Sequence, residues 1–337
     1  MKALIYFEGE KAIKKSGIGR AMSHQLRALK SAGVSTCISP KEDEYDLAHI
    51  NTVYAASKKL LKNCKKKGIP VIVHGHSTYE DFRNSFSCWQ LIEPFFDRML
   101  TYMYSRADLI ITPTPYSKRL IEGYGLGPKV IDISNGIDLS EYAPDQEGVK
   151  MFRERFSLKD DEKPVIGIGF PFERKGIIDF FEVARSMPDT KFIWFGHLAK
   201  IATNAKIRRA IRKRPKNAIM AGYCAGKIIH GALQSSLCLF FPSHEETEGI
   251  VVLEALASHC PLIVRDIGVY EDWLHDGIDC HKGKTNDDFI RLINELKANG
   301  EKQEILDNGY ALAKERTLDK VGIQLKKAYE ELLASKK

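Results

Sequence analysis

The segment LCLFFPSHEETEGIVVLEALA, residues 237–257, joins a short apolar run to a polar loop and then to a second apolar run. The first run, 237–242, is typical of a strand buried in a parallel sheet. The second run begins after Gly249 and predicts a largely apolar helix. A strand, a loop and a helix in this order are typical of α/β proteins, in which parallel strands alternate with helices.

The same alternation extends from this segment towards both ends of the chain. In the first half, strands are expected at residues 3–7, 34–39, 47–51, 69–74, 108–112 and 130–134, and helices at 20–32, 57–67 and 91–105. In the second half, strands are expected at 165–170, 191–196, 218–223, 237–242 and 261–265, with helices between them and two more after Thr285. We therefore predict an α/β fold built from parallel sheets covered by helices.

Chain length predicts two domains, because 337 residues are about twice the length of a typical one. The turn-rich segment NGIDLSEYAP, residues 135–144, marks the expected boundary. We expect Rossmann-like domains at 1–144 and 145–316, and a C-terminal helix at 317–337 that packs back towards the first domain. Two facing domains of this kind would share an interdomain cleft at the carboxyl ends of their strands, where ligands of open α/β sheets bind.

Composition excludes several classes of protein. Hydrophobic residues make up 44% and charged residues 28%, which is too apolar for a disordered chain. There is no run of about 18 apolar residues, and the first residues, MKALIYFEGEKAIKK, carry charge early, so neither a membrane span nor an export signal is expected. Seven cysteines without a C-x-x-C pair predict a reduced, cytoplasmic protein with no disulfide or zinc site.

A glycine-containing segment, Ser16 to Arg20, precedes the first expected helix and includes Gly17 and Gly19. Glycine lets the backbone approach a ligand closely, and the free amides of a helix start favour a phosphate or sugar oxygen. A tight structural turn explains the segment equally well. It is not the dinucleotide-binding fingerprint, which requires a third glycine where Met22 stands.

A second candidate site follows the first strand of the second domain, in the segment GFPFERKG at residues 169–176. Arg174 and Lys175 lie there at the start of an expected helix. The side-chain charges and the helix dipole would then stabilise the same phosphate group. This arrangement suits a diphosphate leaving group. A solvated basic turn is the alternative interpretation.

A third candidate site is the pair Glu246 and Glu254, separated by seven residues with Gly249 between them. Glu254 lies about two turns into the apolar helix. A carboxylate is costly to bury unless hydroxyl or amide donors meet it, and sugar and ribose hydroxyls are such donors. The pair therefore indicates a site for a polyhydroxylated ligand.

These segments, together with Asn135 to Asp138, resemble the retaining glycosyltransferases of family 4, which have the two-domain GT-B fold. The resemblance covers nearly the whole chain. It implies that Glu246 contacts the donor sugar, that Glu254 holds the ribose, and that Arg174 and Lys175 hold the diphosphate. It also implies donor contacts from the backbone at Gly17, Gly19, Gly249, Ile250 and Val251. The family often has an arginine five residues before the lysine, whereas this chain has Phe170 there, and Arg174 is the expected substitute.

The acceptor side is expected in the segment VHGHSTYEDFR, residues 73–83, which follows a strand of the first domain. His76 looks like the active-site histidine of the family, and His74 is the competing choice. Three further side chains are candidates for orienting an acceptor hydroxyl, with a solvated loop as an equally good explanation: Glu80, Asp81 and Arg83.

Two basic runs are candidates for contact with an anionic membrane surface, with a solvated helix face as the alternative. One holds six lysines in residues 58–67, namely Lys58, Lys59, Lys62, Lys65, Lys66 and Lys67. The other holds seven basic residues between Lys206 and Lys216. Aromatic residues Phe82, Phe86 and Trp89 precede an apolar helix and are candidates for admitting a lipid, although most of that helix is expected in the core. Neither run matches a nucleic-acid-binding pattern, so nucleic acid is not expected as a partner.

Taken together, the motifs predict a hexosyltransferase that uses a nucleotide sugar, UDP-glucose or UDP-galactose. The segments from Lys15 to Arg20 and from His76 to Arg83 look similar to bacterial synthases that extend glycosyl-diacylglycerols. This similarity implies a membrane glycolipid as acceptor. Such an enzyme would be cytoplasmic and peripheral on the inner face of the membrane. No metal and no cofactor are expected, because basic side chains and helix dipoles would stabilise the leaving diphosphate. Two alternatives remain: a soluble or polysaccharide acceptor, and a non-catalytic GT-B subunit that binds a partner enzyme.

Overall fold

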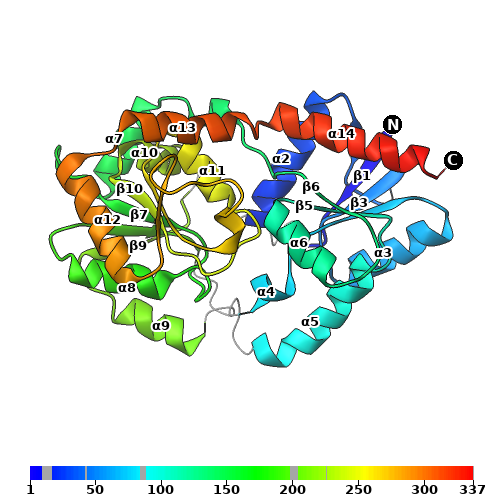
Figure 1. Cartoon of the computed structure of the whole chain (residues 1–337), viewed down its shortest axis with the longest axis horizontal. Helices are drawn as coiled ribbons and strands as arrows, with labels where there is room; N and C mark the ends of the chain where they lie inside the picture. Colours follow the sequence, from blue (N-terminus) through cyan, green and yellow to red (C-terminus); the bar gives the residue numbers. More distant parts are fainter. Residues whose placement is uncertain (10–16, 42–43, 84–88, 198–203, 225, 337) are drawn as a thin grey trace. The chain divides into compact units, whose positions relative to one another are not determined.

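The computed structural model describes residues 1–9, 17–41, 44–83, 89–197, 204–224 and 226–336 (Figure 1). The chain divides into two compact units. Unit 1 comprises Met1–Phe82, Gln90–Ile137 and Arg316–Lys337, and unit 2 comprises Asp138–Glu315 with the short segment Arg83–Trp89. The C-terminal segment therefore belongs to the same unit as the N-terminus.

Unit 1 is built on a parallel six-stranded sheet with the order β2-β1-β3-β4-β5-β6. The central strands are short apolar runs and are buried throughout, which is why they form the middle of the sheet. Its strands are β1 (Lys2–Tyr6), β2 (Ser35–Cys37), β3 (Leu47–Ile50), β4 (Val71–His74), β5 (Leu109–Thr112) and β6 (Val130–Asp132). Its helices are α2 (Gly17–Ser31), α3 (Ala55–Lys66), α4 (Tyr79–Phe82), α5 (Trp89–Tyr104), α6 (Pro115–Gly123) and α14 (Leu318–Ala334).

Helix α14 packs against α2 although the two are far apart in sequence (Figure 1). The approach is so close that a Cβ on Gly322 would lie 2.0 Å from the carbonyl oxygen of Ala28. Leu325 and Tyr329 of α14 are buried in the same core as Leu29 of α2. The last helix is thus an integral part of the core of unit 1.

Unit 2 is built on a second parallel sheet, also six-stranded, with the order β12-β11-β10-β7-β8-β9. Aromatic rings fill its core, with Phe180 packed edge-on against Trp194 and stacked on Phe240. Its strands are β7 (Val165–Ile168), β8 (Phe192–Phe195), β9 (Ala218–Gly222), β10 (Cys238–Phe241), β11 (Leu262–Arg265) and β12 (His281–Gly283). Its helices are η1 (Leu139–Tyr142), α7 (Gln146–Arg155), α8 (Ile177–Ser186), α9 (Ala205–Arg212), α10 (Lys227–Ser235), α11 (Ile250–Ala257), η2 (Gly268–Tyr270), α12 (Asn286–Asn299) and α13 (Gln303–Lys314).

The α/β class and the two Rossmann-like sheets predicted from the sequence are confirmed. All eleven expected strands are present, with ends that differ by at most two residues, and β12 is an additional strand. The expectation of two helices after Thr285 is wrong, because α12, α13 and α14 follow it. Gly300, with φ of 70°, ends α12 and separates it from α13.

No helix in the described ranges has both the length and the apolar character that crossing a membrane requires. The cysteines within those ranges are free thiols, and Cys238 is buried in the core as expected. Cys88 lies outside the described residues.

Candidate active site

The candidate site in unit 2 is formed where the loops after β7 and β10 meet. Gly176 adopts a left-handed conformation with φ of 72°, and a Cβ there would lie only 2.2 Å from the carbonyl oxygen of Pro242. The backbone N–H of His244 also donates to the carbonyl of Arg174 at 2.7 Å. Only glycine permits this approach, which holds Arg174 and Lys175 beside the loop that carries Glu246.

Lys175 and Glu246 form a buried ion pair. Lys175 Nζ contacts Glu246 Oε1, and the exposed fractions of the two side chains are 17% and 6%. Ser243 Oγ donates to the same oxygen at 2.6 Å, and Arg174 Nη1 lies 3.8 Å from it. Burial acts to raise the pKa of Glu246, but the charges of Lys175 and Arg174 outweigh it and hold the pKa below its usual value. Glu246 is therefore a carboxylate at neutral pH.

The start of helix α11 lies directly after this loop. Gly249 precedes the helix with φ of 84°, a conformation that favours glycine. Ile250 and Val251 form the first turn, whose backbone amides lack partners within the helix and can donate to a ligand. Glu254 lies further along α11 and is 7% exposed. The structure thus brings Arg174, Lys175, Glu246 and the start of α11 into one region of unit 2.

Gly17 and Gly19 differ from the sequence-based expectation. They lie in the first turn of α2, which begins at Gly17, rather than in a turn before the helix. A Cβ on Gly17 would meet no atom of the described residues within 4 Å, so their packing does not require glycine there. Ser16 lies outside the described residues.

The two histidine candidates of unit 1 lie together in a stack of imidazole rings. The rings of His76 and His74 are 3.8 Å apart, and His74 Nδ1 shares a hydrogen bond of 3.1 Å with His49 Nε2. His76 Nε2 donates to Asn51 Oδ1 at 3.1 Å. Burial lowers the pKa of His76 to about 3 and that of His74 well below its ordinary value, so both rings are neutral at pH 7.

The proposed acceptor residues occupy α4 and its end. Glu80 accepts a hydrogen bond of 2.5 Å from Tyr124 Oη, so this carboxylate is held by the fold rather than solvated in a loop. The backbone N–H of Asp81 donates to Thr78 Oγ1 at 3.0 Å. Arg83 is exposed at the end of the helix.

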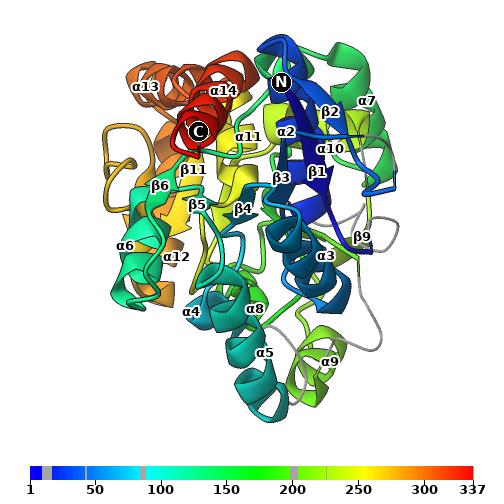
Figure 2. The same cartoon turned by 90° about the vertical axis from the view of Figure 1, so that its right-hand side faces the viewer.

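The lysine run lies on α3, with Leu60, Leu61 and Cys64 on the buried side of the helix. Lys65 pairs with Asp108 at 2.7 Å. Helix α5 lies beside α3, and Lys58 Nζ is 4.3 Å from the centre of the Tyr102 ring (Figures 1 and 2). The expectation that most of α5 is core is wrong, because four of its sixteen residues are buried, Phe96, Leu100, Met103 and Tyr104, and its N-terminal half is largely exposed. There Leu91 and Phe95 are 82% and 66% exposed. Phe86 lies outside the described residues.

The second basic run lies largely on α9, where Lys206 pairs with Glu173. Sequence reasoning did not single out Ser243, whose hydroxyl donates to Glu246 Oε1. Ser243 follows β10 three residues before Glu246, and a polar residue directly after a buried strand is the signal that could have identified it.

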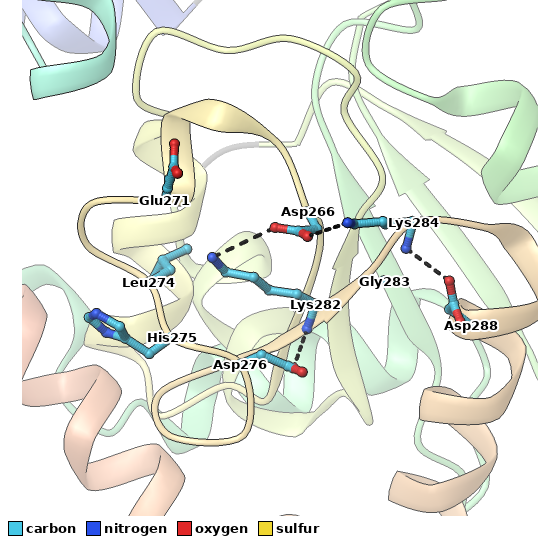
Figure 3. A pocket seen from close by; sticks show the side chains of 9 residues that line it. All are labelled: Asp266, Glu271, Leu274, His275, Asp276, Lys282, Gly283, Lys284 and Asp288. Atoms are coloured by element: carbon cyan, nitrogen blue, oxygen red, sulfur yellow. Dashed lines mark hydrogen bonds and ion pairs between the residues drawn. The ribbon is translucent and has the colours of Figure 1, made fainter.

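An open cavity of about 540 Å³ lies beyond β11 and β12 (Figure 3). Its charged side chains largely contact one another: Lys282 Nζ and Lys284 Nζ lie 3.9 and 3.4 Å from Asp266. Within the described ranges, no three potential metal-ligating side chains gather.

Two parallel Rossmann-like sheets, with a cation–carboxylate cluster at the strand ends of the second, define a GT-B glycosyltransferase. Residues 17–141 match the family described as Glycosyltransferase Family 4, and residues 150–310 match Glycosyl transferases group 1. The chain is 50% identical over 338 residues to the processive diacylglycerol alpha-glucosyltransferase of Acholeplasma laidlawii, covering 100% of both chains. The chain therefore belongs to the glycosyltransferase family that these two matches and this relative define, as its motifs predicted.

Two further similarities extend this result. The chain is 26% identical to the alpha-galactosylglucosyldiacylglycerol synthase of Streptococcus pneumoniae (strain ATCC BAA-255 / R6), over 84% of this chain and 77% of the synthase. Its fold matches the crystal structure of Anabaena HepE in complex with UDP-glucose with a TM-score of 0.78, at 14% identity, over 98% of this chain and 100% of the other.

Proposed function

We propose that this glycosyltransferase transfers a hexose from a UDP-sugar, UDP-glucose or UDP-galactose, to a hydroxyl of a membrane glycolipid such as a monoglycosyldiacylglycerol, with retention of anomeric configuration. The names of two relatives describe synthesis of glycosylated diacylglycerols, and one structural neighbour holds UDP-glucose. The observation that carries the proposal is the buried cluster of Lys175, Arg174 and Glu246 beside the start of α11.

The cluster suits departure of a diphosphate. Negative charge grows on the leaving phosphate as the glycosidic bond breaks, and preorganised cations stabilise that charge without further rearrangement. Glu246 holds Lys175 and Arg174 in place before a donor arrives. The amides at the start of α11 add further donors in the same region.

The carboxylates suit the hydroxyl groups of the donor. Glu246 is ionised and accepts hydrogen bonds, so it can bind hydroxyls of the hexose. Glu254, on the second turn of α11, is the proposed partner of the ribose. In unit 1, His76 is a neutral imidazole and is the proposed active-site histidine on the acceptor side.

A basic and apolar surface of unit 1 is the proposed membrane contact. Lys58 of α3 lies over the ring of Tyr102 near the C-terminal end of α5, and the N-terminal end of the same helix exposes Leu91, Ile92 and Phe95. Each basic residue near anionic headgroups contributes about 1 kcal/mol to binding, and apolar side chains can insert below the headgroups. We therefore propose that the enzyme acts at the inner face of the cell membrane, where a glycolipid acceptor and a cytoplasmic nucleotide sugar would meet.

The test is an assay of the purified chain with UDP-glucose and UDP-galactose in the presence of vesicles. One set of vesicles contains monoglycosyldiacylglycerol and anionic lipid, a second lacks the glycolipid, and a third lacks the anionic lipid. We expect transfer only with the glycolipid and stimulation by the anionic lipid. Equal transfer to soluble sugars without vesicles would favour the soluble-acceptor alternative, and nucleotide binding without any transfer would favour the non-catalytic subunit.

A pair of lysine variants tests the membrane surface. The first variant replaces four exposed lysines on α3 and at its C-terminal cap with glutamine: Lys59, Lys62, Lys66 and Lys67. The control removes the same charge elsewhere with four exposed lysines: Lys30, Lys129, Lys302 and Lys327. We expect flotation with anionic vesicles to weaken by up to about 10³-fold in the first variant at low salt and to change little in the control. An equal loss in both variants would show that only net charge matters.

A further inference from the structure

Tyr270 is a fully buried residue at the end of η2, which follows β11. Its side chain is 0% exposed, and its ring packs edge-on against Trp273 with 5.9 Å between ring centres. Its backbone carbonyl accepts a hydrogen bond of 3.0 Å from Lys282 Nζ, one of the lysines drawn in Figure 3. Backbone and ring are thus both held in place.

The hydroxyl of Tyr270 has no hydrogen-bond partner in the part of the chain that the structure describes. Two other tyrosines are equally buried, and both are bonded: Tyr104 Oη donates to the carbonyl of Ser77 at 2.6 Å, and Tyr329 Oη lies 2.7 Å from His49 Nδ1. A buried hydroxyl without a partner is costly, and native proteins rarely keep one without a reason. A bound ligand that supplies the missing acceptor is such a reason.

The hydroxyl lies against the loop that carries the candidate donor site. A Cβ on Gly249 would stand 3.0 Å from Tyr270 Oη, so the phenol oxygen lies directly beside the residue that precedes α11. Burial, together with the negative charges of Glu246, Glu248 and Glu245, raises the pKa of Tyr270 well above its ordinary value. The phenol therefore stays protonated and is a hydrogen-bond donor at all physiological pH values.

We propose that the Tyr270 hydroxyl donates a hydrogen bond to a hydroxyl oxygen of the hexose carried by the nucleotide sugar, which makes Tyr270 a donor-sugar binding residue. This inference rests on the proposed function. The three glutamates near the phenol disfavour an anionic phosphate oxygen as the acceptor, whereas a neutral sugar hydroxyl carries no such penalty.

The chemistry of Glu246 complements that of Tyr270. In the described structure every contact of this carboxylate, from Lys175, Ser243 and Arg174, is made by Oε1, which leaves Oε2 for a ligand. A sugar hydroxyl is both a donor and an acceptor. One hydroxyl, or two neighbouring ones, can therefore donate to Glu246 while accepting from Tyr270.

Tyr270→Phe tests the proposal, because it removes only the hydroxyl and keeps the ring. Three quantities are measured for the variant and the wild type: the midpoint of thermal unfolding without ligand, the affinity for UDP, and the affinity for UDP-glucose by calorimetry. Tyr329→Phe is the matched control, since it removes a buried hydroxyl that has a partner.

We expect Tyr270→Phe to unfold at the same or a higher temperature than the wild type, because the hydroxyl it loses is unsatisfied in the free protein. Its affinity for UDP should stay within about twofold, and its affinity for UDP-glucose should fall about three- to tenfold. Tyr329→Phe should show the opposite pattern, with a lower unfolding temperature and unchanged affinity for both ligands.

Three outcomes would overturn the inference. A lower unfolding temperature in ligand-free Tyr270→Phe would show that the hydroxyl stabilises the fold itself. An equal loss of affinity for UDP and UDP-glucose would move the contact from the sugar to the nucleotide. Unchanged affinity for UDP-glucose, with a wild type that binds it, would remove Tyr270 from the site and leave the proposed function intact. A wild type that binds neither ligand would instead reject the proposed donor, and the inference with it.

Discussion

Replacing Lys175 with methionine tests the charge balance of the candidate active site. Methionine keeps most of the side-chain length but removes the ammonium group that meets Glu246 Oε1. The carboxylate left behind is 6% exposed, with only Ser243 Oγ at 2.6 Å and Arg174 Nη1 at 3.8 Å to compensate for it. We expect turnover to fall more than about tenfold, because the missing cation would have met the charge of the departing diphosphate.

The same substitution should also destabilise the free protein. Removing one partner of a buried ion pair costs about 3–5 kcal/mol. Because Arg174 remains and Lys175 is 17% exposed, we expect a smaller loss of about 2–3 kcal/mol in the free energy of unfolding. Adding Glu246→Gln removes the stranded charge, so the double variant should recover part of this loss, with a coupling energy of about 1–3 kcal/mol.

The loss of stability caused by Lys175→Met should depend on pH, and its direction follows from the pKa of Glu246. The pKa of Glu246 is lowered in the folded protein, so its ionised form stabilises the fold above its unfolded pKa and this contribution is lost as the pH falls through the folded pKa. In Lys175→Met, burial opposes ionisation with less compensation, and the pKa of Glu246 rises. The difference in stability between variant and wild type should therefore be largest near pH 7 and smaller near pH 4.

Urea unfolding of the wild type, the two single variants and the double variant at both pH values completes the thermodynamic cycle. Lys206→Met is the control, because Lys206 and Glu173 form a more exposed pair, with 64% and 30% of their side chains accessible. Such a pair contributes less than about 1 kcal/mol. Additive losses in the cycle at both pH values, or a loss no larger than that of Lys206→Met, would refute the reasoning.

Three further predictions concern other residues of unit 2. Glu254→Gln should weaken binding of UDP by roughly ten- to a hundredfold in calorimetry, since hydrogen bonds to a charged group contribute about 1.5–3 kcal/mol; unchanged affinity would make Glu254 structural. Gly249→Ala should lower the unfolding midpoint, because φ of 84° strains alanine and its Cβ would press on Tyr270 Oη at 3.0 Å, and an unaltered midpoint would contradict this. The hydrogen bond to Glu301 at 2.8 Å raises the pKa of His281. Protonated His281 therefore stabilises the fold at pH values below its unfolded pKa, and this contribution is lost as the pH rises through the folded pKa. His281→Gln should therefore cost more stability near pH 5.5 than near pH 8.5, and equal losses at both would exclude the titration.

Strands were predicted well from the sequence where burial on both faces requires continuous apolar runs, as in β4 and β10. The edge strand β12 was missed because its residues, His-Lys-Gly, form no apolar run and only pairing with β11 makes them a strand. Helix α14 was expected, but α13 before it was not separated, because the break depends on the conformation of Gly300 rather than on a change of hydrophobic pattern.

The sequence also predicted which residues of unit 2 lie together, because glutamates and basic residues stand at recognisable spacings after two strands; their role in binding a donor stays a prediction. The ion pair between Lys175 and Glu246 could not be predicted. That Lys175 meets Glu246 in the free protein depends on the close approach of Gly176 to Pro242, a tertiary contact. The unsatisfied hydroxyl of Tyr270 was beyond sequence reasoning for the same reason, since whether a buried tyrosine finds a partner is decided by neighbours far away in the chain.

The place of α14 in unit 1 has a consequence for synthesis on the ribosome. At about 5–20 residues per second, α14 is translated roughly ten to forty seconds after β6. Until then the nascent N-terminal unit lacks Val321, Leu325 and Tyr329, and the side of α2 that they cover stays open to solvent. Unit 2 needs no such late segment, because its sheet lies within Asp138–Glu315. The second half of the chain can therefore complete its fold before the first half, whose core stays incomplete until α14 has been synthesised.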